Sequence, residues 1–256
     1  MNNANTTSAV SQTAKVAIIT GASRGIGAAI AQRLAADGMA VVVNYASRSG
    51  EADALVAKIA AAGGKAVAVK ADVADPVAVA QLFDAAEAAF GKVDVLVNNA
   101  GVMPAGLPAL ADTDDAAFDS IFNINVKGSF NTMRQAAKRL QSGGRIVNFS
   151  TSVSGLALPG YSVYAASKSA IETMTNIFAK ELRGKQITVN AVAPGPTATD
   201  LFLTGKTEEV IERMSKAAPL ERLGTPADIA AVVAFLVGAD GGWINGQTLR
   251  ANGGLV

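Results

Sequence analysis

The sequence predicts an α/β protein built on a doubly wound parallel sheet. Short apolar runs, rich in β-branched residues, alternate along the chain with alanine-rich stretches of helical pattern. Runs that are apolar without a strict period of two are typical of strands covered on both faces. Repeated β-α units require right-handed crossovers, and these place helices on both sides of one sheet.

Six runs predict strands, and seven stretches predict helices. The strands are expected at residues 16–20, 40–44, 66–70, 93–98, 145–150 and 188–192, and the helices at 25–36, 49–62, 76–90, about 114–141, 162–182, 208–216 and 226–237. Gly38 suits a helix C-cap, and Pro76 suits a first helical turn. We expect one domain at 15–256 with a flap at about 194–226, preceded by a flexible leader at 1–14.

Composition excludes several classes of function. The chain has no Cys and no His, which removes thiol chemistry, the Ser-His-Asp triad and the commonest metal ligands, so no metal site is expected. A formal net charge of +1 gives no reason to expect nucleic acid or a membrane surface as partner. No secretory signal or membrane-spanning run is visible, which predicts a cytoplasmic protein.

A glycine-rich turn, Thr-Gly-Ala-Ser-Arg-Gly-Ile-Gly at residues 20–27, follows the first predicted strand and opens the first helix. Gly21 permits a tight turn, Gly25 lets the backbone approach a pyrophosphate, and Gly27 allows close packing of helix on strand. The helix N-terminus then offers free N–H groups to phosphate oxygens. A chance cluster of glycines is the alternative, but the strand-turn-helix context favours a Rossmann-type dinucleotide site.

The end of the second strand indicates which dinucleotide binds. An acidic residue that would bind the ribose 2′-hydroxyl of NAD is absent before Glu51, and the segment reads Asn44, Tyr45, Ala46, Ser47, Arg48. Arg24, Ser47 and Arg48 suit a 2′-phosphate instead. We expect NADP(H) rather than NAD(H), the alternative being that both arginines are ordinary solvated charges.

Tyr164 and Lys168 are four residues apart in a helical pattern, so their side chains share one face. A cation beside a phenol favours the phenolate, which predicts a lowered pKa and an acid/base role for Tyr164. A surface Tyr packed on a Lys stem is the alternative. Hydroxyl side chains at 150–152 close the strand before this helix, where open α/β sheets bind ligands.

Together these motifs resemble the short-chain dehydrogenase/reductase family, in its single-domain branch with 3-oxoacyl-ACP reductases and glucose dehydrogenases. The match covers roughly residue 15 to the C-terminus, and it includes the glycine-rich turn, Asp72, residues 98–101, Asn125, the serine segment, Tyr164, Lys168 and residues 194–195 in family order. The resemblance implies a seven-stranded parallel sheet of order 3-2-1-4-5-6-7. It also implies a homotetramer that oxidises alcohols or reduces carbonyls.

The resemblance also implies roles for single residues. Asp72 with Val73 would hold the adenine. Asn125 would bend its helix and anchor a water against Lys168, which grips the nicotinamide ribose. The expected cofactor contacts are Gly21, Ser23, Arg24, Gly25, Ile26, Gly27, Asn44, Tyr45, Ala46, Ser47, Arg48, Asp72, Val73, Asn99, Ala100, Gly101, Tyr164, Lys168, Pro194, Gly195, Thr197 and Thr199. Thr197 departs from the branched aliphatic residue usual in the family, which a backbone contact tolerates.

The expected catalytic residues are Asn125, Ser152, Tyr164 and Lys168. Ser152 is chosen because residues 152–155 fit the Ser-x-x-Gly pattern of the family, although Thr151 or Ser150 fits other alignments. In reduction, Ser152 would hold the carbonyl oxygen, and Tyr164 would protonate it as NADPH delivers hydride.

A neutral, partly apolar ketone or aldehyde is the expected substrate, because no cluster of Arg or Lys is evident at the expected pocket. That pocket comprises Met103, Pro104, Leu158, Tyr161, Leu201, Phe202 and Leu203. Two other functions are open: a catalytically idle nucleotide-binding or scaffold protein, and an epimerase or dehydratase on the same fold.

Overall fold

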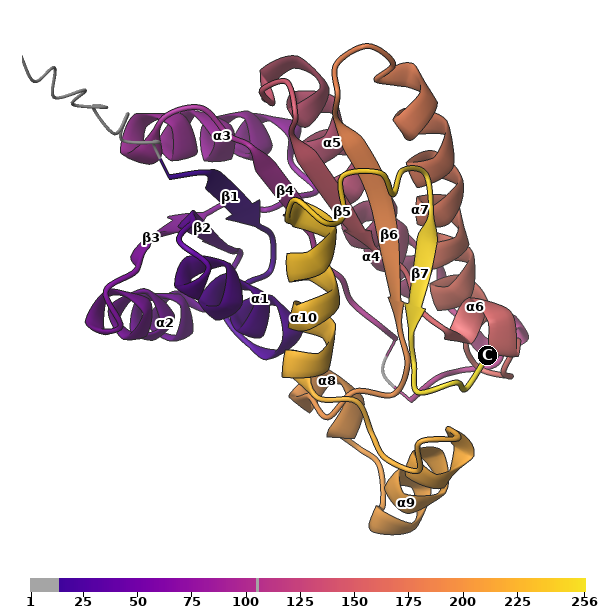
Figure 1. Cartoon of the computed structure of the whole chain (residues 1–256). Coiled ribbons are helices and arrows are strands. Elements are labelled where there is room, and N and C mark those ends of the chain that lie inside the picture. Colours follow the sequence, from indigo (N-terminus) through magenta and orange to yellow (C-terminus); the bar gives the residue numbers. More distant parts are fainter. Residues whose placement is uncertain (1–13, 105) are drawn as a thin grey trace, which may run out of the picture.

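Parallel strands form the central sheet of the computed structural model, which describes residues 14–104 and 106–256. Within these residues the sheet has seven strands in the order β3-β2-β1-β4-β5-β6-β7, which confirms the expected topology (Figure 1). The strands are β1 (Val16–Ile19), β2 (Ala40–Tyr45), β3 (Lys65–Lys70), β4 (Val95–Asn98), β5 (Arg145–Phe149), β6 (Thr188–Pro194) and β7 (Thr248–Ala251).

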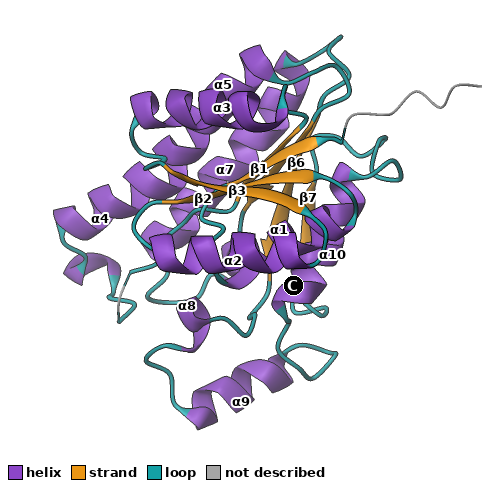
Figure 2. Cartoon of the chain, turned by 90° about the vertical axis from the view of Figure 1, so that its left-hand side faces the viewer, coloured by secondary structure: helices purple, strands orange, loops and turns teal. Residues whose placement is uncertain are grey.

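Helices cover both faces of the sheet, as Figure 2 shows. One layer contains α1 (Gly25–Ala36), α2 (Ser49–Ala61) and α10 (Pro226–Val237), and the other contains α3 (Pro76–Phe90), α5 (Gly128–Arg139) and α7 (Ser162–Glu181). Alternate residues of β1 belong to the two cores: Ala17 and Ile19 to the first, Val16 and Ile18 to the second. Burial on both faces explains why the strand sequences lack a polar face.

The helix predicted over 114–141 is interrupted in the structure. It consists of α4 (Asp115–Ile121), a π-helical turn η2 (Phe122–Lys127) and then α5. A π-turn widens the helix locally and is common at functional sites. Here the wide turn contains Asn125, whose side chain is fully buried.

Short elements gather beyond the carboxyl ends of the strands. They are η1 (Leu110–Asp112), α6 (Val153–Leu156), α8 (Asp200–Leu203) and α9 (Glu208–Ala217), and α8 and α9 belong to the predicted flap. In Figure 1 this flap lies below the arrowhead of β6, with α9 farthest from the sheet. The leader predicted at residues 1–14 lies, except for residue 14, outside the described residues. No helix of the described chain is long and apolar enough to cross a membrane.

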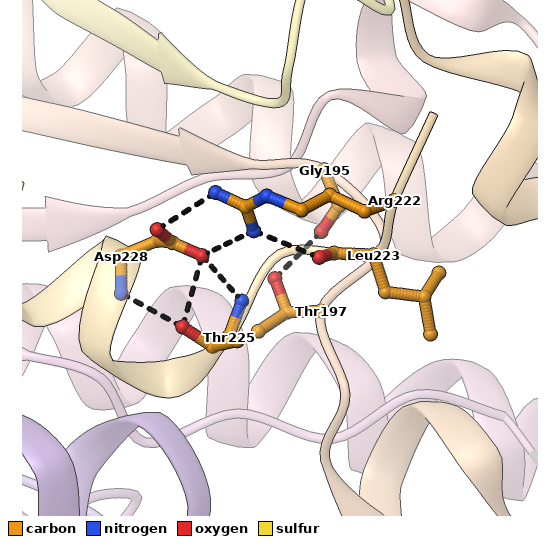
Figure 3. Close-up of polar contacts among 6 residues, drawn as sticks. All are labelled: Gly195, Thr197, Arg222, Leu223, Thr225 and Asp228. Atoms are coloured by element: carbon orange, nitrogen blue, oxygen red, sulfur yellow. Dashed lines mark hydrogen bonds and ion pairs between the residues drawn. The ribbon is translucent and has the colours of Figure 1, made fainter. Parts of the chain in front are cut away.

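The two ends of the flap are fastened to each other. Ala198 N–H donates to the Gly224 carbonyl at 2.8 Å, and Gly224 N–H donates to the Pro196 carbonyl at 2.9 Å. Next to these two backbone hydrogen bonds, Thr225 and Asp228 form a capping box at the start of α10 (Figure 3). Arg222 binds both carboxylate oxygens of Asp228. These charge-assisted bonds lower the pKa of Asp228 well below its usual range. The flap is therefore a loop closed at its base, with α8 and α9 projecting from a fixed neck.

Candidate active site

A cleft of about 310 Å³ runs along the carboxyl edge of β1–β4, beside the N-terminus of α1. Most of the expected cofactor contacts line it: Gly21, Ser23, Arg24, Gly25, Ile26, Gly27, Asn44, Ala46, Ser47, Asp72, Val73, Asn99, Ala100, Gly101 and Thr199. Parallel strands bring these segments together because their carboxyl ends share one edge of the sheet.

The glycine-rich turn leaves no room for side chains at two positions. A Cβ on Gly21 would lie 2.8 Å from Ala100 Cα, and one on Gly27 would lie 2.6 Å from the Gly21 carbonyl oxygen. Gly21 also has φ +59°, which disfavours other residues. The Asn99 side chain donates 2.9 Å hydrogen bonds to the carbonyls of Thr20 and Gly21, which holds the turn in shape. The cradle fits a dinucleotide pyrophosphate at the start of α1.

Two expected cofactor contacts, Tyr45 and Arg48, line neither this cleft nor the cavity that adjoins it. Tyr45 packs against the hydrophobic core, and Arg48 forms a 2.7 Å ion pair with Glu51. Arg24 does line the cleft, where its guanidinium lies 3.5 Å from Asp200 of α8. Of the two arginines expected at a 2′-phosphate, only Arg24 therefore faces the cleft.

A second cavity, of about 720 Å³, adjoins the cleft and contains both Tyr164 and Lys168 in its wall. The two cavities share Ile26, Asn99, Gly101, Val102, Thr199 and Leu201. The expected residues Pro194, Gly195 and Thr197 line this second cavity, as does Thr199. A molecule bound in the second cavity would therefore lie beside the nicotinamide end of a dinucleotide bound in the cleft.

Lys168 is held in place by groups at the ends of β4 and β5. Its ammonium is buried, donates a 2.9 Å hydrogen bond to the Phe149 carbonyl, and lies 5.9 Å from the centre of the Tyr164 ring. Asn125 is clamped by Val102, accepting from its N–H at 2.8 Å and donating to its carbonyl at 3.0 Å. A Cβ on Gly101 would lie 3.2 Å from Asn125 Oδ1 and 3.3 Å from Lys168 Nζ, so both groups border one small space.

Burial governs the pKa of both members of the pair. Loss of solvation lowers the pKa of Lys168 to about 8. Loss of solvation also raises the pKa of Tyr164 to about 12, while a hydrogen bond with the Thr151 hydroxyl acts in the opposite direction and Tyr161 raises it further. The expectation of a lowered Tyr164 pKa is wrong, because desolvation outweighs the neighbouring groups. The phenol is consequently protonated at neutral pH.

The three hydroxyl residues after β5 have different partners. Ser150 donates to Glu172, and Thr151 interacts with Tyr164 so as to lower its pKa. The Ser152 hydroxyl donates to the Ala193 carbonyl at 3.1 Å and accepts from the Asn252 side chain at 3.0 Å. Thr151 and Ser152 both line the cavity of Tyr164, and Thr151 is the one that interacts with the phenol. The signal for this in the sequence is the short gap between Ser152 and Tyr164, which Thr151 lengthens by one residue.

The residues that line the second cavity differ in part from those expected from the sequence. Met103, Leu158, Tyr161, Leu201 and Phe202 line it as expected, whereas Pro104 and Leu203 do not. Sequence reasoning missed other apolar residues, Leu107, Leu156, Val210, Met214 and Leu255, and two cations of the flap, Lys206 and Arg213. Lys206, Val210, Arg213 and Met214 belong to the flap, and their position over the cavity is a tertiary property with no local signal.

Comparisons with known proteins agree with this geometry. Residues 21–256 match a family model described as enoyl-(acyl carrier protein) reductase. A short-chain type dehydrogenase/reductase from Picea abies is 50% identical, covering 94% of this chain and 92% of that protein. An NADPH-dependent aldehyde reductase-like protein, chloroplastic, from Arabidopsis thaliana is 44% identical over 94% of each chain. The crystal structure of a short chain dehydrogenase from Burkholderia cenocepacia with NADP is 42% identical, with a TM-score of 0.88 over 94% of this chain and 97% of that one.

The burial of Lys168 predicts a gain in stability when its charge is removed. The pKa of Lys168 falls from 10.5 to about 8 on folding, so below pH 8 the folded protein bears the whole cost of the buried cation. Between about pH 8 and 10.5 the unfolded state binds more protons, and the cost disappears. We expect Lys168→Met to be more stable at pH 7, by about 3 kcal/mol at most, with the difference shrinking toward pH 10. Thermal melting across this pH range measures the effect; a variant that melts below the wild type at pH 7 contradicts it.

Proposed function

Because the chain belongs to the short-chain dehydrogenase/reductase family, we propose that it is an NADP(H)-dependent oxidoreductase that interconverts a carbonyl and an alcohol by hydride transfer. The observation that carries the proposal is the position of Tyr164 and Lys168, in the wall of a substrate-sized cavity that opens into the dinucleotide cleft. An idle nucleotide-binding protein needs neither the second cavity nor a buried ammonium beside a phenol.

The choice of NADP(H) rests on charge at the cleft. No acidic residue stands at the end of β2, and Arg24 and Ser47 line the cleft where a 2′-phosphate would lie. The names of the Arabidopsis relative and of the Burkholderia complex specify NADPH or NADP. Arg24 would exchange its 3.5 Å contact with Asp200 for the phosphate, which a guanidinium binds through charge-assisted hydrogen bonds. Arg48 would have to leave Glu51 to take part.

The side chains of the site divide the work of carbonyl reduction. Bound NADPH supplies the hydride. Tyr164, protonated at neutral pH, donates its proton to the carbonyl oxygen as charge develops there. Lys168, largely cationic below its pKa of about 8, stabilises the phenolate left behind. Asn125 keeps the wall beside Lys168 polar and, with a bound water, would let a proton return to Tyr164.

We assign the substrate-orienting hydroxyl to Thr151 instead of Ser152. The hydroxyl of Thr151 interacts with Tyr164, so a substrate carbonyl oxygen placed there would accept hydrogen bonds from both hydroxyl groups. The Ser152 hydroxyl already has both a donor and an acceptor partner inside the protein. Ser152 thereby fastens the active-site loop to β6 and to the C-terminal segment.

Two apolar surfaces support the homotetramer that the resemblance implies. Phe118, Phe130 and Ile177 are exposed on α4, α5 and α7, while Phe235 and Trp243 are exposed on α10 and in the loop that precedes β7. Two self-complementary contacts per chain build a closed tetramer.

We expect light scattering to give about four times the chain mass of 25.8 kDa; a monomer contradicts the assignment. A cytoplasmic location stays a prediction from the sequence.

Loss of the phenol tests the proposed chemistry. We expect Tyr164→Phe to lower kcat at least ~100-fold, because general acid catalysis contributes roughly 10²–10⁴ in rate. The measurement is consumption of NADPH and, separately, NADH against a panel of aldehydes and ketones. Near-normal turnover in the variant, or a wild type that prefers NADH, would refute the proposal.

A matched pair of variants tests the assignment of the hydroxyl. Thr151→Val keeps the shape of the side chain and removes only the oxygen, so we expect a fall in kcat of ~100-fold or more. Ser152→Ala should keep kcat within several-fold and instead lower stability by about 1 kcal/mol, since buried hydrogen-bond partners are lost. The reverse ranking of the two kcat values would return the role to Ser152.

A further inference from the structure

Two cations of the flap line a cavity whose wall is mostly apolar. Lys206 follows α8, and Arg213 lies on α9; both line the cavity that contains Tyr164. Leucine, valine and methionine side chains form much of the remaining wall. No Asp or Glu lines this cavity in the described part of the chain, so its only charged residues are Lys168, Lys206 and Arg213.

Neither flap cation has an acidic partner among the described residues. Lys206 donates to the Phe202 carbonyl and lies 4.6 Å from the centre of the Phe202 ring. Arg213 forms no ion pair there, although Glu209 precedes it by one turn on α9. By contrast, Arg222 at the neck of the same flap is fully paired with Asp228.

Lys206 is half-buried at the cavity, whereas Arg213 is exposed. Burial lowers the pKa of Lys206, which shows that its ammonium is partly removed from water. An ordinary solvated cation incurs no such cost, and an apolar wall amplifies the attraction between unpaired cations and an incoming anion. A guanidinium in particular binds a carboxylate through two parallel hydrogen bonds.

From these contacts we propose that the substrate is an oxo acid: an apolar body with the reactive carbonyl at one end and a carboxylate at the other, the carboxylate binding Arg213 and Lys206. This rests on the proposed function and makes its substrate class more specific. It replaces the neutral substrate expected from the sequence. The carbonyl end lies at Tyr164 and Thr151, and the flap helices α8 and α9 contribute the anion site on the far side of the apolar wall.

The test compares acids with their own methyl esters. Aldehyde acids of increasing chain length and the matching esters are reduced with NADPH, and kcat/KM is measured for each. We expect the acid to be preferred at least ~10-fold at the best length, a free-energy difference of about 1.4 kcal/mol. High salt should reduce this ratio, because it screens the ion pair.

Three variants assign the preference to its residues. Arg213→Met should bring the acid-to-ester ratio close to one, and Lys206→Met should lower it several-fold. Lys216→Met is the control, because Lys216 lies on the same helix, pairs with Glu212 and does not line the cavity. This control should leave both rates unchanged. Melting curves confirm that each variant folds.

Several results would overturn the inference. Equal rates for acids and esters, or a ratio that survives Arg213→Met, would show that the flap cations do not bind the substrate. An equal loss for acid and ester with a raised KM for NADPH would assign them to the cofactor instead. If esters and neutral aldehydes turn over without any preference for the acid, only this inference is contradicted. If no carbonyl compound turns over, the proposed function is contradicted as well.

Discussion

The site depends on an ammonium that is kept out of water. Lys168 is buried at the end of β5, where its one hydrogen bond to protein goes to the Phe149 carbonyl and the Asn125 amide borders the same space. Such a charge is costly in an apolar surrounding, and strongly perturbed pKa values cluster at functional sites. In the proposed mechanism its function is to assist Tyr164, because burial raises the pKa of the phenol and a nearby cation favours loss of its proton.

The fold provides this site through one edge of its sheet. Each parallel strand ends at the same edge, so the glycine-rich turn after β1, the Asn99 segment after β4 and the hydroxyls after β5 converge without long loops. The π-turn η2 contributes to the site from the helical layer, because its buried Asn125 borders the same space as Lys168. The flap then closes over the cavity from a neck fastened by residues 196–198 and 224–228.

The sequence predicted those features that have a local cause. Buried strands, the tight turn at Gly21 and the shared helical face of Tyr164 and Lys168 follow from periodicity and steric rules, and the structure has each of them. Features decided by packing were missed. Periodicity predicted one unbroken helix over 114–141, and only the resemblance, with its helix-bending Asn125, pointed to the π-turn. The raised pKa of Tyr164 reflects burial that spacing does not reveal.

The same limit applies to single side chains at the site. Thr151 and Ser152 are adjacent hydroxyl residues, and only the backbone direction after β5 decides which of them faces Tyr164. Lys206 and Arg213 were not predicted at the cavity, because the path of the flap over it is set by tertiary contacts. Arg48 showed the opposite error: its nearest partner is Glu51, three residues away, rather than a cofactor cleft.

A titration of the lysine side chains by NMR tests the central claim directly. With ¹³C-labelled lysine, the account predicts that one ε-methylene resonance titrates near pH 8, well below the ordinary lysine value of 10.5, and that this resonance is missing from Lys168→Met. If every lysine resonance titrates near 10.5, Lys168 is solvated, and the buried cation on which this account of Tyr164 depends does not exist.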